Sequence, residues 1–200
     1  MNYFVAGIDT DSGKTLVSAI LCEALGFDYW KPVQAGFPTD SDAIKAWLPN
    51  TIIHQEAYVL KTPASPHAAA KIDGITIDLK KITLPKSMNG LIIEGAGGCL
   101  VPLNDSDFVI DLVPVLNAEI VLVADLYLGS INHTLLTVNL LQSRKYQVKG
   151  IIFNGEANPE SERIILKHSG YRCLLRIAKE PTITLEAIRR YATILKTNWK

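Results

Sequence analysis

Short apolar runs that alternate with helical patterns organise this chain of 200 residues. The apolar runs predict buried strands, because parallel strands covered on both faces carry no polar face. They cover residues 3–6, 27–30, 90–94, 119–124, 148–154 and 172–177. Helical spacing of apolar residues predicts helices over 16–25, 41–48, 132–143 and 159–168, and a last helix from residue 181. This alternation predicts an α/β fold, with a mostly parallel sheet, helices on both faces and residues 1–200 in a single domain.

The first strand leads into a glycine-bounded loop, Gly7 to Gly13, that opens the first helix. Such a loop turns backbone N–H groups inward, and the helix N-terminus adds partial positive charge, so phosphates can bind there. Lys14 can reach the outer phosphates of a nucleotide, and the Thr15 hydroxyl can bind Mg²⁺. Five residues separate the two glycines, one more than in the usual phosphate-loop pattern. A chance Gly-Lys-Thr is the alternative, but the strand and helix that flank the loop favour a nucleotide site.

Three later strands also end in polar residues, Lys31, Glu94 and Asn154. The carboxyl ends of strands in open α/β sheets are where ligands bind. A buried strand that closes on a carboxylate is how phosphate-loop enzymes position Mg²⁺. Glu94 could be an ordinary strand-end residue beside a flexible turn, but the glycine-rich segment 95–98 indicates a ligand close to the backbone. The set predicts an Mg-ATP enzyme, because phosphoryl transfer depends on positioning and charge neutralisation.

The composition indicates the cellular compartment and limits the classes of binding partner. Twenty basic residues balance twenty acidic ones, so no overall field would attract nucleic acid or an anionic membrane. No apolar run has the length of a membrane span. Three cysteines without metal-ligand spacing predict buried thiols in a reducing compartment. The first strand follows at once without a basic leader, so we expect a cytoplasmic protein that acts on small molecules.

Several segments, in this order, resemble the dethiobiotin synthetases, and the resemblance covers most of the chain. The long gap in the phosphate loop is itself the form found in that family. Glu-Gly-Ala-Gly-Gly also occurs in the related cobyric-acid-type amidases, so the order of all the segments makes the resemblance specific. They are residues 7–15, 31–36, 41–43, 65–67, 94–98, 102–103, 128–133 and the strand that ends at 154.

The resemblance implies a homodimeric enzyme of the P-loop NTPase-like fold, which joins CO₂ to 7,8-diaminononanoate with ATP and Mg²⁺ in biotin biosynthesis. In that family a substrate amine first forms a carbamate, and ATP phosphorylates the carbamate oxygen. The second amine then attacks the mixed anhydride and closes the ureido ring. The products are dethiobiotin, ADP and phosphate.

The resemblance also implies roles for single residues. Lys14 would neutralise charge on the transferred phosphoryl group, and Lys31 would stabilise the carbamate anion and its phosphorylation. The Mg²⁺ ligands would be Thr15, Asp42 and Glu94. The ATP site would comprise Asp11, Ser12, Gly13, Lys14, Thr15, Leu16, Asp42, Glu94, Gly95, Ala96, Gly97 and Asn154, which would read the adenine edge. The substrate site would comprise Thr10, Lys31, Ala35, Gly98 and Asn132, the last reached from the other subunit.

Three residues in these segments, Asp42, His67 and His133, could have purely structural roles. Asp42 could simply cap the helix over 41–48, for which Thr39, Asp40 and Ser41 are candidate N-caps. His67 and His133 are expected to start helices or to pack, rather than to act as bases or ligands.

The chain departs from the family pattern in three places. Asp11 stands where many members carry Glu or Gly, so its reach to substrate would be shorter. Ala35 replaces a hydroxyl residue and removes one hydrogen bond to substrate. Leu-Arg-Ile-Ala at 175–178 replaces the Gly-x-Ile-Pro segment near adenine, which leaves the base preference open.

Two other classes of protein share the phosphate loop. Small-molecule kinases close an arginine-bearing lid over the phosphates, but this chain has no arginine before Arg144. Partitioning-type ATPase switches carry a second lysine at the start of the loop, where this chain has Gly-Ile-Asp at 7–9. Both absences favour the synthetase.

Overall fold

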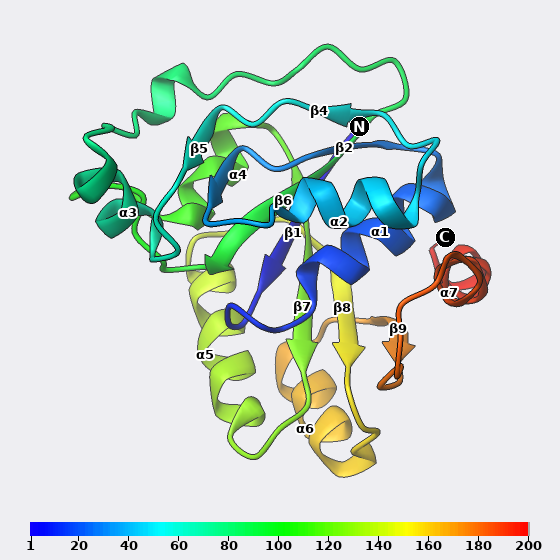
Figure 1. Ribbon diagram of the computed structural model, residues 1–200. Coiled ribbons are helices and arrows are strands. Elements are labelled where there is room, and N and C mark those ends of the chain that lie inside the picture. The colour runs from blue at the N-terminus through cyan, green and yellow to red at the C-terminus, as the bar shows by residue number, and fades with distance from the viewer. Residues whose placement is uncertain (200) are drawn as a thin grey trace.

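A seven-stranded sheet forms the centre of the computed structural model, which describes residues 1–199 (Figure 1). Its strand order is β4-β2-β6-β1-β7-β8-β9, and neighbouring strands pair in parallel. The strands are β1 (Asn2–Gly7), β2 (Asp28–Trp30), β4 (Ile53–His54), β6 (Leu91–Gly98), β7 (Glu119–Asp125), β8 (Val148–Asn154) and β9 (Cys173–Ile177). The predicted α/β fold with its parallel sheet is confirmed.

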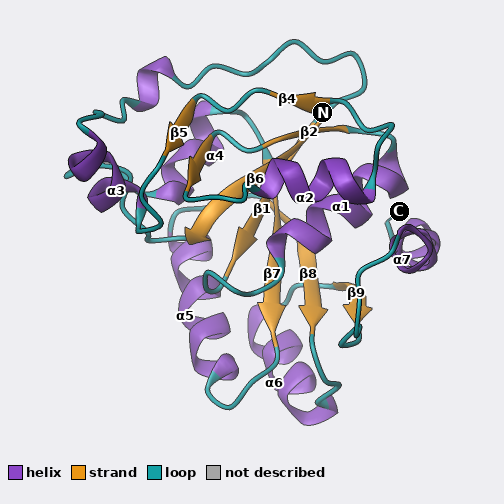
Figure 2. Ribbon diagram, in the orientation of Figure 1, coloured by secondary structure: helices purple, strands orange, loops and turns teal. Residues whose placement is uncertain are grey.

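Helices cover both faces of the sheet, as predicted (Figure 2). Successive residues of β1 point to opposite faces, so Tyr3 and Val5 pack in one apolar cluster while Phe4 and Ala6 pack in the other. The first cluster includes side chains of α1 (Lys14–Leu25), α2 (Asp40–Trp47) and α7 (Leu185–Asn198). The second includes α3 (Pro66–Asp73), α4 (Leu112–Val115), α5 (Ser130–Ser143) and α6 (Pro159–Ser169).

Segments without a clear hydrophobic pattern contain short elements that the sequence did not predict. β3 (Val33–Ala35) pairs in parallel with β5 (Tyr58–Leu60) in a separate two-stranded sheet. Two 3₁₀ turns, η1 (Leu79–Lys81) and η2 (Val109–Asp111), precede β6 and α4. The last helix begins later than predicted, because the Thr184 hydroxyl accepts a hydrogen bond from the backbone of Ala187 and caps it.

Asp28, at the first position of β2, ties the edge of the sheet to its neighbours. Its carboxylate accepts hydrogen bonds from His54 Nε2 at 3.0 Å and Asn89 Nδ2 at 3.1 Å. Burial raises the pKa of Asp28. The hydrogen bonds from these donors and from the Ser87 hydroxyl lower it by more, so the net pKa lies below its ordinary value. The two-residue strand β4 is therefore held to β2 by side chains as well as by its backbone.

None of the helices among residues 1–199 is both long enough and apolar enough to cross a membrane. That residues 1–200 form a single domain stays a prediction.

Candidate active site

The loop between β1 and α1 is shaped by contacts with its own backbone and with β8. Gly13 has a φ of 90°, and a Cβ there would lie 2.3 Å from Asn154 Nδ2, so only glycine fits. Asn154 Nδ2 donates to the Ser12 carbonyl oxygen at 3.1 Å. The buried Ser12 hydroxyl donates to the Asp9 carbonyl oxygen at 3.0 Å. These contacts hold the loop in one conformation at the carboxyl edge of the sheet.

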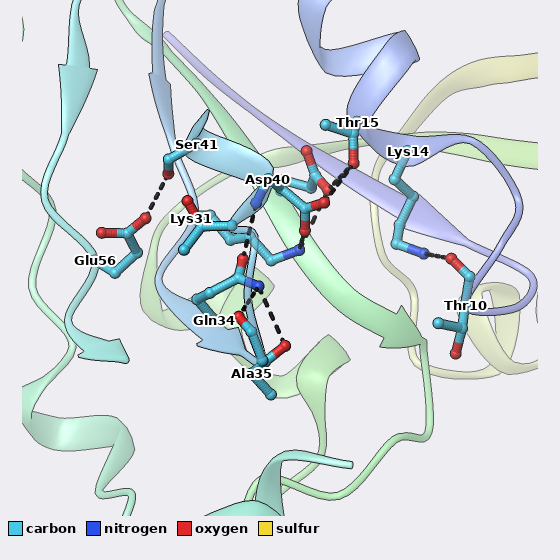
Figure 3. Close-up of polar contacts among 12 residues, drawn as sticks. Thr10, Lys14, Thr15, Lys31, Gln34, Ala35, Asp40, Ser41 and Glu56 are labelled. Atoms are coloured by element: carbon cyan, nitrogen blue, oxygen red, sulfur yellow. Dashed lines mark hydrogen bonds and ion pairs between the residues drawn. The ribbon is translucent and has the colours of Figure 1, made fainter. Parts of the chain in front are cut away.

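Lys14 folds back onto this loop (Figure 3). Its Nζ donates to the carbonyl oxygens of Asp9 at 2.9 Å and Thr10 at 2.8 Å. Burial lowers the pKa of Lys14, and the nearby Glu94 carboxylate partly opposes that effect. The ammonium group contacts the backbone of the loop, and Lys14 lines the cleft into which a bound phosphate would fit.

Two carboxylates, a hydroxyl and a second lysine meet beside the loop. Glu94 Oε1 accepts from Thr15 Oγ1 at 2.9 Å and from Lys31 Nζ at 3.3 Å. Thr15 Oγ1 lies 3.1 Å from Asp40 Oδ1, and the other Asp40 oxygen forms an ion pair with Lys31 (Figure 3). Burial alone would lower the pKa of Lys31, but the Glu94 and Asp40 carboxylates raise it above its ordinary value. The two carboxylates therefore favour the charged form of Lys31 in this site.

The structure corrects the expected position of Asp42. Its carboxylate accepts from the Thr39 backbone N–H at 3.0 Å and from the Thr39 hydroxyl at 2.8 Å, which completes a capping box at the start of α2. Asp42 is exposed and does not line the cleft, whereas Asp40, two residues earlier, does. Residues two apart on a helix point in different directions, so only one of the two can reach Thr15.

A cleft of about 590 Å³ opens over these groups. The segment from Pro63 to Pro66 and the Ala96–Gly97 turn of β6 form its walls. Gln34 supports the floor: its Oε1 accepts from the Asp40 backbone at 3.3 Å, and its Nε2 donates to the Ala35 carbonyl oxygen at 3.2 Å (Figure 3). Gln34 and Asp40 are site residues that the sequence did not assign.

The cleft gathers most of the residues expected to bind ATP or substrate. The expected residues that line it are Thr10, Asp11, Gly13, Lys14, Thr15, Lys31, Ala35, Glu94, Ala96 and Gly97. Seven others do not line it, namely Ser12, Leu16, Asp42, Gly95, Gly98, Asn132 and Asn154. Ser12 is buried inside the loop, and Leu16 packs against the core under α1. Gly95 lies against the Phe4 ring, and Asn132 lines a separate exposed cavity on α5.

A second cavity, of about 540 Å³, adjoins the cleft, since Ser65 and Val101 line both. Gly98 lines this cavity, together with mainly apolar side chains. His67 and His133 also lie here, close to the starts of α3 and α5 as expected, and the Tyr127 hydroxyl contacts His133 Nδ1.

The oxygen atoms of Thr15, Asp40 and Glu94 fit a Mg²⁺ ion. Mg²⁺ prefers hard oxygen ligands, takes few of them from protein and completes its shell with phosphate and water. Residues 1–199 contain no cluster of three or more His, Cys, Asp or Glu side chains that would suit a metal bound by protein alone. This donor set therefore suits an ion that arrives with a nucleotide.

Comparisons with known proteins decide the family. A family model described as an AAA domain matches residues 1–187. The ATP-dependent dethiobiotin synthetase BioD of Cytophaga hutchinsonii is 59% identical over 201 residues, which cover 98% of each chain. The chain belongs to the dethiobiotin synthetase family. Another dethiobiotin synthetase, from Christiangramia forsetii, is 45% identical over 195 residues, or 96% of this chain and 94% of the relative. The resemblance drawn from the sequence motifs is confirmed.

Solved structures with a similar backbone support the fold prediction. The septum site-determining protein MinD of Pyrococcus horikoshii, complexed with Mg-ADP, has a TM-score of 0.62 at 15% identity and covers 100% of this chain and 93% of its own. A ParA family ATPase from Chlorobium tepidum has a TM-score of 0.58 at 15% identity, with 98% and 90% covered. At such low identity these structures show the P-loop NTPase fold alone. The family membership favours a dethiobiotin synthetase over a kinase or an ATPase switch.

Proposed function

We propose that this chain joins CO₂ to 7,8-diaminononanoate with ATP and closes the ureido ring of dethiobiotin. One observation carries the proposal for this site: two lysines, two carboxylates and a phosphate loop converge in one cleft. Carbamate phosphorylation brings several negative charges together, and the cleft supplies opposing charges at fixed positions.

The phosphate loop would bind the nucleotide. The N–H groups at the start of α1 face the loop, and Lys14 would exchange its hydrogen bonds with the Asp9 and Thr10 carbonyl groups for phosphate oxygens. Thr15, Asp40 and Glu94 would hold Mg²⁺, which neutralises charge on the transferred phosphoryl group when bound. The proximity of Asn154 to the loop supports a role in binding the adenine edge.

Lys31 would stabilise the carbamate. Because its pKa is raised, Lys31 keeps its proton and acts as a fixed positive charge rather than as a base. Its Nζ pairs with both carboxylates, and all three residues line the cleft, so an incoming carbamate oxygen would compete with the carboxylates for the ammonium group. The developing charge on that oxygen is what a preorganised cation stabilises.

The mainly apolar second cavity would take the aliphatic chain of the substrate. In a homodimer, the substrate carboxylate would then contact the start of α5 of the partner subunit, where Asn132 of the partner subunit lies. Exposed apolar side chains near this surface support an interface: Leu100, Leu128 and Leu136 are 51%, 104% and 61% exposed. The free thiols of Cys22, Cys99 and Cys173 support a reducing, cytoplasmic location.

Product analysis tests the proposal. The protein is supplied with diaminononanoate, bicarbonate, Mg²⁺ and ATP, and the products are identified by mass. We expect dethiobiotin and ADP in equal amounts, and neither from a Lys31→Gln control. A phosphorylated metabolite without a cyclic urea would indicate a kinase. Slow ATP hydrolysis with a change of binding partner would indicate an ATPase switch.

A further inference from the structure

Tyr29 makes a buried contact with Glu94 that the reaction does not itself require. The Tyr29 hydroxyl donates to Glu94 Oε2 at 3.0 Å. The other carboxylate oxygen, Oε1, accepts from Thr15 and Lys31. The two side chains are 0% and 1% exposed. The two oxygens of Glu94 therefore face different partners, one inside the core and one in the cleft.

The pairing of β2 with β6 creates this contact. Tyr29 is the register partner of Ile92, and Glu94 lies two residues further along β6, so both side chains project to the face covered by α1. The Tyr29 ring packs in the apolar cluster of that face, which restricts the direction of its hydroxyl. A buried carboxylate oxygen without a donor is costly, so the hydroxyl and Oε2 are strongly coupled.

We propose that Tyr29 is a positioning residue that makes Glu94 a one-oxygen ligand for the nucleotide's metal ion. This inference rests on the proposed function, because it takes Glu94 as a Mg²⁺ ligand. With Oε2 held by Tyr29, Glu94 presents Oε1 alone to the cleft. Mg²⁺ demands a compact octahedral shell, whereas Ca²⁺ accepts two oxygens of one carboxylate and a looser shell. Tyr29 thus favours Mg²⁺ over Ca²⁺ at this site.

The test is Tyr29→Phe, which keeps the ring and removes the hydroxyl. ADP binding is measured by calorimetry while Mg²⁺ or Ca²⁺ is titrated, so no synthetase activity is needed. We expect the Mg²⁺ concentration for half-maximal enhancement of ADP binding to rise about tenfold, the size of one lost hydrogen bond to a charged group. The Ca²⁺ requirement should rise less, because the released oxygen can now bind Ca²⁺ as well, and the preference for Mg²⁺ should narrow.

Tyr3→Phe is the matched control. Tyr3 is buried in the same apolar cluster on β1, but its hydroxyl contacts Met1 Sδ at 3.3 Å instead of Glu94. The control should leave both metal requirements unchanged, although it too loses a buried hydroxyl. A purely structural role for Tyr29 would give equal shifts for Mg²⁺ and Ca²⁺, or none, and would overturn the inference.

Glu94→Gln separates this inference from the proposed function. If Glu94→Gln raises the Mg²⁺ requirement and Tyr29→Phe does not, the role of Tyr29 is wrong and the metal site stands. If neither variant changes it, both are wrong. Should Tyr29→Phe fail to fold, the double variant Tyr29→Phe/Glu94→Gln replaces it, since no carboxylate is then left unpaired. The double variant should match Glu94→Gln, and a further loss of Mg²⁺ response would contradict the coupling.

Discussion

Asp40 and Asp42 lie two residues apart, yet the structure gives them separate tasks that mutation can distinguish. Asp40→Ala removes a carboxylate that contacts both Thr15 and Lys31. Loss of one preorganised charged group in a reacting site lowers kcat by roughly 10²-fold or more. We also expect a higher Mg²⁺ requirement, because one of the three proposed oxygen ligands has gone. The fold should survive, since the Asp40 side chain is 34% exposed.

Asp42→Ala removes the hydrogen bonds that the Asp42 carboxylate accepts from Thr39, which are one half of the capping box, and leaves Thr39 as the N-cap. Loss of this half costs up to about 1 kcal/mol of folding stability. For a protein of this size, that lowers Tm by up to about 2–4 °C. The dethiobiotin synthesis rate and its Mg²⁺ dependence should stay at the wild-type values.

Both variants are compared by initial rates over a Mg²⁺ titration and by thermal unfolding. The reasoning fails if Asp42→Ala raises the Mg²⁺ requirement while Asp40→Ala leaves it unchanged. It also fails if both act alike on rate and on Tm. A Ser41→Ala control changes the residue between them; it loses the hydrogen bond of the Ser41 hydroxyl to Glu56, so it should lower Tm slightly and leave the rate and its Mg²⁺ dependence unchanged.

Three further predictions concern other groups. Lys14→Ala should lower kcat by roughly 10²–10³, the loss of one preorganised charge donor, and a rate within a few-fold of wild type would refute the phosphate-loop assignment. Lys31→Ala and Asn132→Ala should each be nearly inactive. Subunit exchange in an equal mixture should restore about a quarter of wild-type activity, because each mixed dimer has one intact site and one site that carries both defects. A mixture that is shown to exchange and is still inactive would rule out a shared site. Asp28→Asn should destabilise the protein in urea at pH 7. The pKa of Asp28 is lowered in the folded protein, so its contribution to folding stability is complete above the unfolded pKa of about 3.9. That contribution is lost as pH falls through the folded pKa. The difference in folding stability between Asp28→Asn and wild type should therefore shrink at low pH.

The strands and helices with strong hydrophobic patterns were predictable from the sequence, as the agreement of 148–154 with β8 shows. The elements that were missed are short. β3, β4 and β5 have two or three residues each, too few for alternation to stand out from chance. Their strand conformation depends on pairing with distant segments, for example of Val33 with Tyr58, and local sequence does not encode that pairing directly.

That Lys14, Lys31 and Glu94 meet in one cleft was predictable, because each lies at or beyond the predicted end of a strand and belongs to a recognisable motif. The Ser-Asp-Ala motif favoured Asp42, but Thr39 and Asp42 have the three-residue spacing of a capping box, which occupies the Asp42 carboxylate. The contacts of Asp40 with Thr15 and Lys31 appear only in the structure. Tyr29 could not have been found, because its hydroxyl reaches Glu94 only through the register of β2 and β6, which the sequence does not state.

The two edge strands of the seven-stranded sheet, β4 and β9, affect the tendency of the chain to aggregate at high concentration. An exposed strand with a long row of unpaired N–H and C=O groups can recruit strands from other molecules and start aggregation. At one edge, β4 has only two residues, so that row is very short. At the other edge, β9 carries Arg176, which is paired with Glu162. Charged side chains on an edge strand disfavour pairing with a strand of a neighbouring molecule. Both edge strands are thus poor templates for pairing with a strand of another molecule.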